Sequence, residues 1–220
     1  MHYPRFLLCV SALFLPLTAA QSVAAEPVSL FNGEDLSGWT FDCLDETVAM
    51  GDVWSVEEGI LKNAGNPKSV LRTEAEFARY KLELEWRWPG EGGNSGVLVH
   101  STDPQAKNVW PRSLEVQLMS ENAGDFWVIG CEAITPPESF GVEDSVKGRR
   151  HINFNDGAEK PLGEWNAMTV HVDGPTVLVT VNGEIVNYCR DSTATAGAIC
   201  LQSEGTPVEF RNIVLTPFED

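Results

Sequence analysis

The side chains most able to do chemistry gather between residues 92 and 127. A glycine-rich segment, GGNSG at 92–96, carries Asn94 in a flexible turn, and a segment rich in aromatic and polar residues follows. Its candidate site residues are Trp110, Arg112, Glu115, Gln117, Asp125 and Trp127. Carboxylate, amide and guanidinium groups hydrogen-bond to hydroxyls, and indole rings offer large apolar faces. The combination predicts a sugar-sized polar pocket on a β-sheet, with Asn94, Trp110, Gln117, Asp125 and Trp127 as substrate-binding residues.

Glu115 and Gln117 are the central pair of this segment. Side chains two positions apart on a strand point to the same face, about 7 Å from each other. Ordinary glycoside hydrolysis uses two carboxyl groups at a controlled separation. Because Gln117 cannot titrate, this strand lacks one member of such a pair. The alternative is that both residues only form a solvated polar face.

Three further side chains are candidates for the catalytic machinery. The planar guanidinium of Arg112 suits two-point contact with a carboxylate or with neighbouring sugar oxygens. An ion pair of Arg112 with Glu115 or Asp125 is the structural alternative. His100 ends the strand after the glycine turn, and His151 lies in a long irregular segment, so either could act as a base. A single histidine is more often structural, and both interpretations stay open.

A second polar pair occurs near the C-terminus. Gln202 and Glu204 share one face of a predicted strand and could meet Glu115 across a curved sheet as substrate-binding groups. A simple pairing of Glu204 with Arg211 on the next strand is the alternative. The glycine turn at 92–96 matches neither a nucleophile elbow nor a phosphate-binding loop. We expect it to allow close approach to a ligand or to a neighbouring strand.

The elements that must position these groups are short strands. The segment 81–88 alternates strictly, so Leu82, Leu84, Trp86 and Trp88 share one face, and 113–119 behaves in the same way. The dipeptide Asn182-Gly183 predicts a two-residue hairpin between 176–181 and 184–188. Further strands are predicted at 53–62 with a break at Glu58-Gly59, and at 69–73, 97–100, 127–133, 165–172, 197–203 and 207–215.

This pattern predicts an all-β sandwich of antiparallel sheets. We expect no long helix, and only one short turn between Glu74 and Arg79. The region 134–163 is rich in Gly and Pro, and a loop this long is usually functional or mobile. We expect it to cover an edge of the site, with a disordered excursion as the alternative.

The N-terminal 25 residues have the pattern of a secretory signal. Arg5 precedes an apolar run from Phe6 to Leu17, and Val23-Ala24-Ala25 is a small-residue cleavage site. The run is shorter than the roughly 20 residues that a membrane-spanning helix needs. We therefore expect a mature domain at 26–220 that is secreted or periplasmic, with no membrane span.

Charge and cysteine content limit the function further. Removing residues 1–25 lowers Lys plus Arg from 15 to 14 against 32 Asp plus Glu, which gives a net charge of −18. So acidic a protein repels phosphate backbones, which argues against nucleic acid as a partner. An exported compartment permits disulfides. The four remaining cysteines could form disulfides or be buried as free thiols, and the sequence leaves both open for Cys43, Cys131, Cys189 and Cys200.

Seven segments in order carry a family resemblance. They are Leu30–Trp39, Gly93–Val97, Leu114–Leu118, Gly163–Asn166, Val181–Gly183, Leu201–Gly205 and Glu209–Ile213. With them the chain resembles, over 29–216, the bacterial family named for 3-keto-disaccharide hydrolase. The resemblance implies a concanavalin A-like jelly roll with its ligand groove on a concave sheet. It also implies cleavage of glycosides already oxidised to a ketone at C3 of the sugar.

The implied substrate changes how the site is interpreted. A C3 ketone acidifies the C2 hydrogen, so one base suffices: the enolate expels the C1 substituent and water then adds. Glu115 is our expected base, with His151 and His100 as rivals. Arg112, or a divalent cation held by Glu115 and Asp125, would stabilise the ketone oxygen. The alternatives are a non-catalytic carbohydrate-binding module and an interaction domain without a small ligand.

Overall fold

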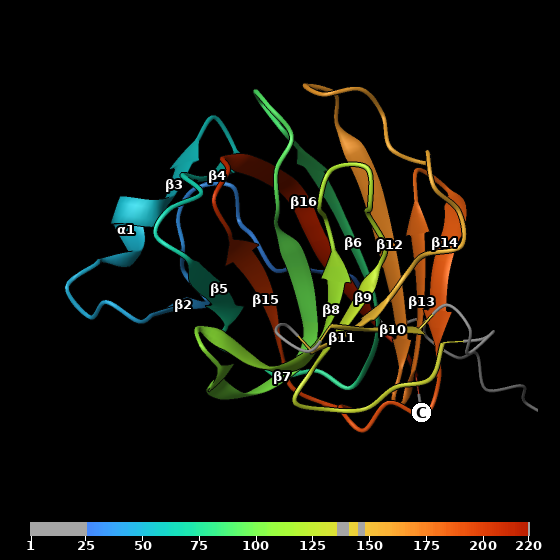
Figure 1. Ribbon diagram of the computed structural model, residues 1–220. Coiled ribbons are helices and arrows are strands. Elements are labelled where there is room, and N and C mark those ends of the chain that lie inside the picture. Colours follow the sequence, from blue (N-terminus) through green and yellow to red (C-terminus); the bar gives the residue numbers. More distant parts are fainter. Residues whose placement is uncertain (1–25, 136–140, 145–147, 220) are drawn as a thin grey trace, which may run out of the picture.

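The computed structural model describes residues 26–135, 141–144 and 148–219, and its strands form two antiparallel sheets packed face to face (Figure 1). Sheet A has the order β14-β13-β12-β6-β16-β4-β3, with β1 also paired to β16. Its strands are β1 (Val28–Ser29), β3 (Trp54–Glu57), β4 (Ile60–Asn63), β6 (Arg79–Arg87), β12 (Asn166–Asp173), β13 (Thr176–Val181), β14 (Glu184–Cys189) and β16 (Val208–Pro217).

Sheet B has the order β10-β11-β9-β8-β7-β15-β5-β2. Its strands are β2 (Trp39–Cys43), β5 (Ser69–Thr73), β7 (Gly96–Lys107), β8 (Trp110–Gln117), β9 (Phe126–Ile129), β10 (Gly141–Asp144), β11 (Gly148–His151) and β15 (Ala198–Ser203). A single short helix, α1 (Met50–Val53), precedes β3 in the described chain. This is the predicted all-β, concanavalin A-like jelly-roll sandwich.

The core lies between the two sheets and follows the predicted alternation. Leu82, Leu84, Trp86 and Trp88 are each at most 2% exposed, and Leu114, Val116 and Leu118 are fully buried against them from sheet B. Burying each such side chain contributes roughly 1.5–3 kcal/mol to folding. A second, smaller apolar cluster lies on the other face of sheet B, and its members are Val70, Leu98, Val109, Ile129 and Cys200.

Most predicted strands are present with small shifts at their ends. The break at Glu58-Gly59 is the turn between β3 and β4, and Asn182-Gly183 is the turn between β13 and β14. Asn182 and Gly183 have φ angles of 50° and 87°, as a two-residue hairpin of this type requires. The local pattern therefore identified these hairpins correctly.

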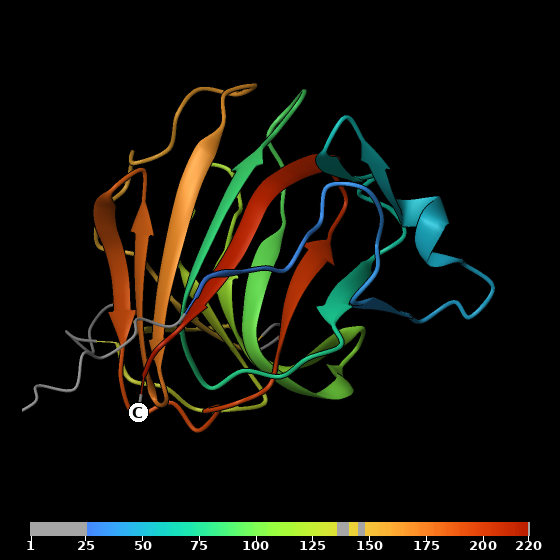
Figure 2. The ribbon, with the colours of Figure 1, turned by 180° about the vertical axis from the view of Figure 1, so that it is seen from behind.

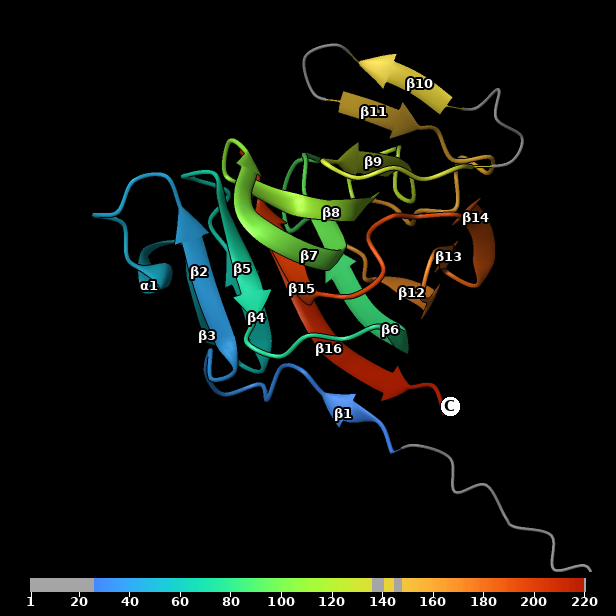
Figure 3. The same ribbon diagram turned by 90° about the horizontal axis from the view of Figure 1, so that it is seen from below.

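Three local predictions were wrong or incomplete. The region 134–163 is not one loop, because β10 and β11 form a hairpin that continues sheet B beyond β9 (Figure 3). No helical turn occupies Glu74–Arg79, where Phe77 instead pairs with Gly197. The helix at Met50–Val53 was not predicted, since four residues are too few to show a helical period.

Each sheet has, near its centre, a strand from the C-terminal end of the sequence. β15 lies between β7 and β5, and Figure 2 shows β16 between β6 and β4. The four cysteines 43, 131, 189 and 200 are free thiols rather than disulfides. Burial raises the pKa of both Cys189 and Cys200 to about 12, so these two thiols are unreactive at neutral pH. Among the described residues, no helix has the length and apolar character to cross a membrane.

Candidate functional site

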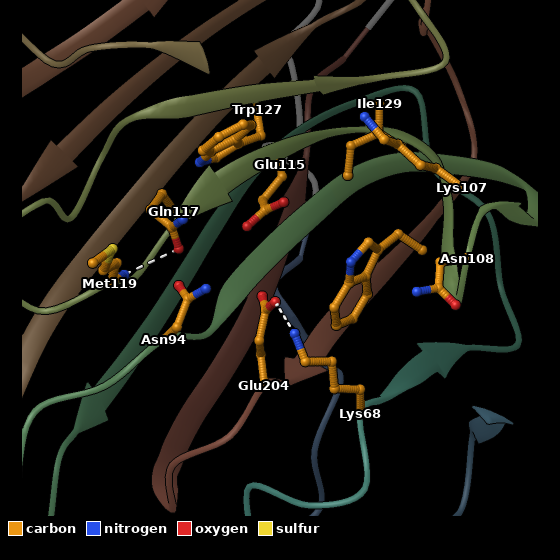
Figure 4. A pocket seen from close by; sticks show the side chains of 11 residues that line it. Lys68, Asn94, Lys107, Asn108, Glu115, Gln117, Met119, Trp127, Ile129 and Glu204 are labelled. Carbon is orange, nitrogen blue, oxygen red and sulfur yellow. Dashed lines mark hydrogen bonds and ion pairs between the residues drawn. The ribbon is translucent and has the colours of Figure 1, made fainter. Parts of the chain in front are cut away.

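A pocket of about 330 Å³ opens on the face of sheet B that points away from the core (Figure 4). Its size is within the usual range for small-molecule sites. The pocket is lined by Lys68, Asn94, Lys107, Asn108, Trp110, Glu115, Gln117, Met119, Trp127, Ile129 and Glu204. Six of the predicted site residues therefore meet here: Asn94, Trp110, Glu115, Gln117, Trp127 and Glu204.

The pairing of β7, β8 and β9 sets the floor of the pocket. Glu115 on β8 is directly opposite Leu98 on β7 and Trp127 on β9. Gln117, two residues further on, is opposite Gly96. Because alternate residues of β8 face the core, the predicted placement of Glu115 and Gln117 on one face is confirmed.

Gly96 is the small residue that lets the polar groups converge. A Cβ atom at this position would lie 2.7 Å from Oε1 of Glu115 and 2.8 Å from Oε1 of Gln202. Both distances are shorter than any ordinary carbon–oxygen contact. The glycine turn also approaches a neighbouring loop, since a Cβ on Gly93 would lie 2.2 Å from Thr206. The expectation of close approach by this turn is thus confirmed.

Glu115 is the most perturbed acid of the pocket. The residue is 5% exposed, and burial raises the pKa of its carboxyl to about 8. Burial is the largest cause of this pKa value, which also includes a smaller increase from the negative charge of Glu204 and a decrease from the nearby amide of Gln202. A carboxyl that changes charge close to neutral pH is suited to proton transfer.

Amide side chains surround this carboxyl and have unused hydrogen-bonding groups. Gln202 is 1% exposed, and neither atom of its amide reaches hydrogen-bond geometry with a protein group. Oδ1 of Asn94 is likewise buried without a partner. The side-chain oxygen of Gln117 accepts from the backbone N–H groups of Leu118 and Met119, both at 3.0 Å, so its NH2 group is left for a ligand. Buried amides of this kind usually bond to something, which indicates a polar ligand.

A second carboxylate enters the pocket from the end of β15. Glu204 forms an ion pair with Lys68, with Nζ 2.8 Å from Oε1, and its side chain is 17% exposed. The expectation that Gln202 and Glu204 meet Glu115 is therefore confirmed. The alternative pairing of Glu204 with Arg211 was wrong, because Arg211 pairs with Glu85 on sheet A at 2.8 Å.

Arg112 and His100 do not line the pocket. Arg112 donates from Nε to the carbonyl of Gly130 at 3.0 Å and from Nη2 to the carbonyl of Thr193 at 2.9 Å. These bonds hold the guanidinium to backbone outside the site. His100 is fully buried, with its ring nitrogens 2.9 and 3.1 Å from the carbonyl oxygens of Ala194 and Ala78. Burial lowers the pKa of His100, and its ring fixes backbone rather than facing a ligand.

His151 and Asp125 also lie outside the pocket lining. Nδ1 of His151 is 2.6 Å from the hydroxyl of Thr135, and the side chain is 3% exposed. Asp125 accepts from Nε of Arg150 at 2.7 Å and from the backbone N–H of Asn153 at 2.6 Å. A cation held jointly by Glu115 and Asp125 does not fit this arrangement, because Asp125 is committed to Arg150.

Five lining residues were not predicted. They are Lys68, Lys107, Asn108, Met119 and Ile129. Four of them, Lys68, Lys107, Asn108 and Ile129, lie at the end of a strand or directly next to one, where alternation gives little information about direction. Alternation could have signalled Met119, since it follows Gln117 by two residues and so shares its predicted face.

Comparison with known proteins agrees with this geometry. The family model described as 3-keto-alpha-glucoside-1,2-lyase-like domain matches residues 26–216. The chain belongs to this family. Membership makes it a carbohydrate-active protein, and the resemblance drawn from its motifs is thereby confirmed. No curated protein sequence matches the chain.

Several solved structures with this fold are described as carbohydrate-active enzymes or as carbohydrate-binding modules. A candidate glycosyl hydrolase of Parabacteroides distasonis is 21% identical, with a TM-score of 0.63 over 88% of this chain and 94% of that one. Carbohydrate-binding module CBM66 of Bacillus subtilis is 11% identical, with a TM-score of 0.56 over 80% and 93%. The κ-carrageenase of Pseudoalteromonas carrageenovora is 14% identical, with a TM-score of 0.52 over 92% and 98%. At these identities the likeness concerns the fold.

Proposed function

We propose that the protein cleaves 3-keto-glycosides by elimination across C1 and C2 of the oxidised sugar, followed by addition of water. The observation that supports this most is the carboxyl of Glu115, which is buried at the pocket among unpaired amides and has a pKa of about 8, near neutral pH. The family description names the same bond, since a 1,2-lyase acts across C1 and C2.

Glu115 is the proposed base. In its ionised form it takes the C2 proton, and the electron pair of the C2–H bond forms an enolate with its charge on the C3 oxygen. The enolate then collapses: the ketone is restored, a C1=C2 double bond forms, and the bond between C1 and the leaving oxygen breaks. The leaving oxygen takes a proton from solvent. Addition of water to the double bond releases the free 3-keto sugar.

The amides around Glu115 have the proposed role of stabilising the enolate. The NH2 group of Gln117 is a hydrogen-bond donor without a protein acceptor. The amide of Gln202 lies close enough to the Glu115 carboxyl to lower its pKa, but does not reach hydrogen-bond geometry with it. Donors already in place for a developing oxyanion are among the strongest catalytic devices. They replace Arg112, whose guanidinium is engaged by Gly130 and Thr193.

The high pKa of Glu115 matters for the strength of this base. At pH 7 about one molecule in ten carries the ionised group, but that group accepts a proton much more readily than an ordinary carboxylate. A carbon acid activated by a ketone needs such a base. Glu204, ion-paired with Lys68, sustains the high pKa through its charge.

The proposal is tested with 3-keto-trehalose and a methyl 3-keto-glucoside, in EDTA and with added divalent metal. We expect consumption of substrate, a transient enone, and exchange of the C2 hydrogen with D2O. Glu115→Gln should lower kcat by about 10²–10⁴-fold. The matched control is Glu83→Gln, which alters an exposed acid on sheet A. Binding of both substrates without turnover in any metal condition would refute catalysis and favour a carbohydrate-binding module.

We further propose that residues 1–25 direct export and are removed near Ala25. The charged start, apolar run and small-residue site support this. N-terminal sequencing of protein recovered from the periplasm or medium should begin at Glu26. Recovery of the protein only from the cytoplasm, with Met1 intact, would contradict export.

A further inference from the structure

The two halves of the pocket differ in chemistry. On one side of Glu115 lie the amides of Asn94 and Gln117, while Ile129 and Lys107 lie on the other (Figure 4). Trp110 also lines the pocket and belongs to the second half, because it is the cross-strand partner of Lys107. The second half also rests on the apolar cluster of sheet B, which Trp110 and Trp127 extend. A sugar ring with its hydroxyls matches the amide half. The apolar half is built for a different group.

Lys107 and Trp110 form a unit at the tip of the β7–β8 hairpin. They are direct cross-strand partners, joined through Asn108, whose φ is 63°, and Val109, which is 1% exposed. Burial of Val109 in the apolar cluster fixes the hairpin tip over the pocket. Figure 4 shows the Lys107 side chain reaching toward Ile129. An ammonium group thus lies beside aromatic and aliphatic surface.

The charge of Lys107 is not neutralised by the protein. Lys62, Lys68 and Lys81 each pair with a glutamate, but Lys107 has no ion pair within residues 26–135, 141–144 and 148–219. Arg112 and Lys160 also lack ion pairs in this part of the chain, but they donate to backbone carbonyls and do not line the pocket. A half-buried cation beside an apolar floor recognises a ligand that is both apolar and anionic.

We propose that this half of the pocket is an aglycone subsite selective for an aromatic leaving group that carries a negative charge, such as a carboxylate. Trp110 and Ile129 contact the ring, and the Lys107 ammonium pairs with the acid. The inference rests on the proposed cleavage of 3-keto-glycosides, because only then does an aglycone occupy the site. It adds the class of leaving group to that proposal.

The test compares two substrates that differ in one charge. The 3-keto-glucosides of 4-hydroxybenzoate and of 4-hydroxybenzamide have nearly the same shape, and only the first is anionic. We expect kcat/KM to be about tenfold higher for the benzoate, which is the lower end of what one hydrogen bond between charged groups gives. Lys107→Met should bring the ratio close to one with little change for the benzamide. The matched control, Lys81→Met on sheet A, should keep the wild-type ratio.

A ratio that is the same in wild type and Lys107→Met, or that favours the benzamide in wild type, would overturn the subsite. Free 4-hydroxybenzoate separates this result from failure of the proposed reaction. Calorimetry should show that it binds wild type and binds Lys107→Met at least fivefold more weakly, whether or not any keto-glycoside is turned over. Equal binding by the two proteins would reject the subsite even if catalysis is observed.

Discussion

Replacing Glu115 by Gln should change how the stability of the protein depends on pH. Burial raises the pKa of Glu115 from its ordinary value of 4.5 to about 8. The folded protein therefore holds this proton more tightly than the unfolded chain does. The resulting contribution to the free energy of unfolding is complete below pH 4.5 and is lost as the pH rises to 8.

The magnitude follows from the two pKa values. Each pH unit between them changes the free energy of unfolding by about 1.4 kcal/mol, so the full loss approaches about 5 kcal/mol. Between pH 5 and pH 9 the wild type should lose about 4 kcal/mol through this one group. Glu115→Gln has nearly the same shape but no charge, so it should not lose this contribution and should exceed wild type in stability at pH 9.

Urea unfolding at pH 5, 7 and 9 measures the effect. The matched control is Glu83→Gln, which removes one negative charge from an exposed position paired with Lys81. The control should follow the wild-type curve within about 0.5 kcal/mol. Parallel stability curves for Glu115→Gln and wild type would refute a protonated, buried Glu115, and with it the proposed origin of the base.

Three further outcomes follow from the site. Gly96→Ala should lower turnover at least tenfold in steady-state kinetics, because its Cβ would displace the Glu115 carboxyl. The same substitution should lower the free energy of unfolding in urea by about 1–3 kcal/mol. Unchanged kinetics would contradict this prediction. If Glu115 is the base, kcat/KM should rise with pH with a midpoint at about 8, the pKa of its carboxyl. Glu204→Gln should move this midpoint to lower pH, because it removes a negative charge that raises the pKa of Glu115. An unchanged midpoint would show that Glu204 does not affect the pKa of Glu115. Asp125→Asn should lower the free energy of unfolding, measured with heat or urea, by about 3 kcal/mol, since it leaves the Arg150 guanidinium without its buried partner. The kcat of the folded variant should stay within about twofold of wild type. A large loss of kcat would show that Asp125 takes part in the reaction.

Alternation made much of the fold and the centre of the site predictable. It located Glu115 and Gln117 on one face of β8 because Leu114 and Val116 had to face the core. The same rule argues against Arg112 as a pocket residue, because Arg112 precedes Leu114 by two positions and should share its face of the strand. Trp110 has that spacing too but lines the pocket, because register shifts in the β7–β8 pairing interrupt the alternation.

The errors come from backbone irregularity and from partners distant in sequence. His100 has a φ of 53°, so its ring leaves the direction that strand periodicity implies. Asp125 forms an ion pair with Arg150 on β11. No local pattern indicated that this region would pair with β9. Lys107 ends β7 and Lys68 directly precedes β5. Only the assembled sheet shows that both side chains line one pocket. Long-range pairing therefore decided what local sequence could not.

The central position of β15 and β16 has a consequence for how the chain reaches its native state. Until residues 198–217 are synthesised, β5 and β7 in one sheet, and β4 and β6 in the other, have exposed edges where these strands belong. Such edges invite pairing with other chains. Nascent or C-terminally truncated protein should therefore aggregate rather than persist as a smaller folded unit. Gln202 lies in β15 and Glu204 directly follows it, so the groups around Glu115 come together only once this strand is in place.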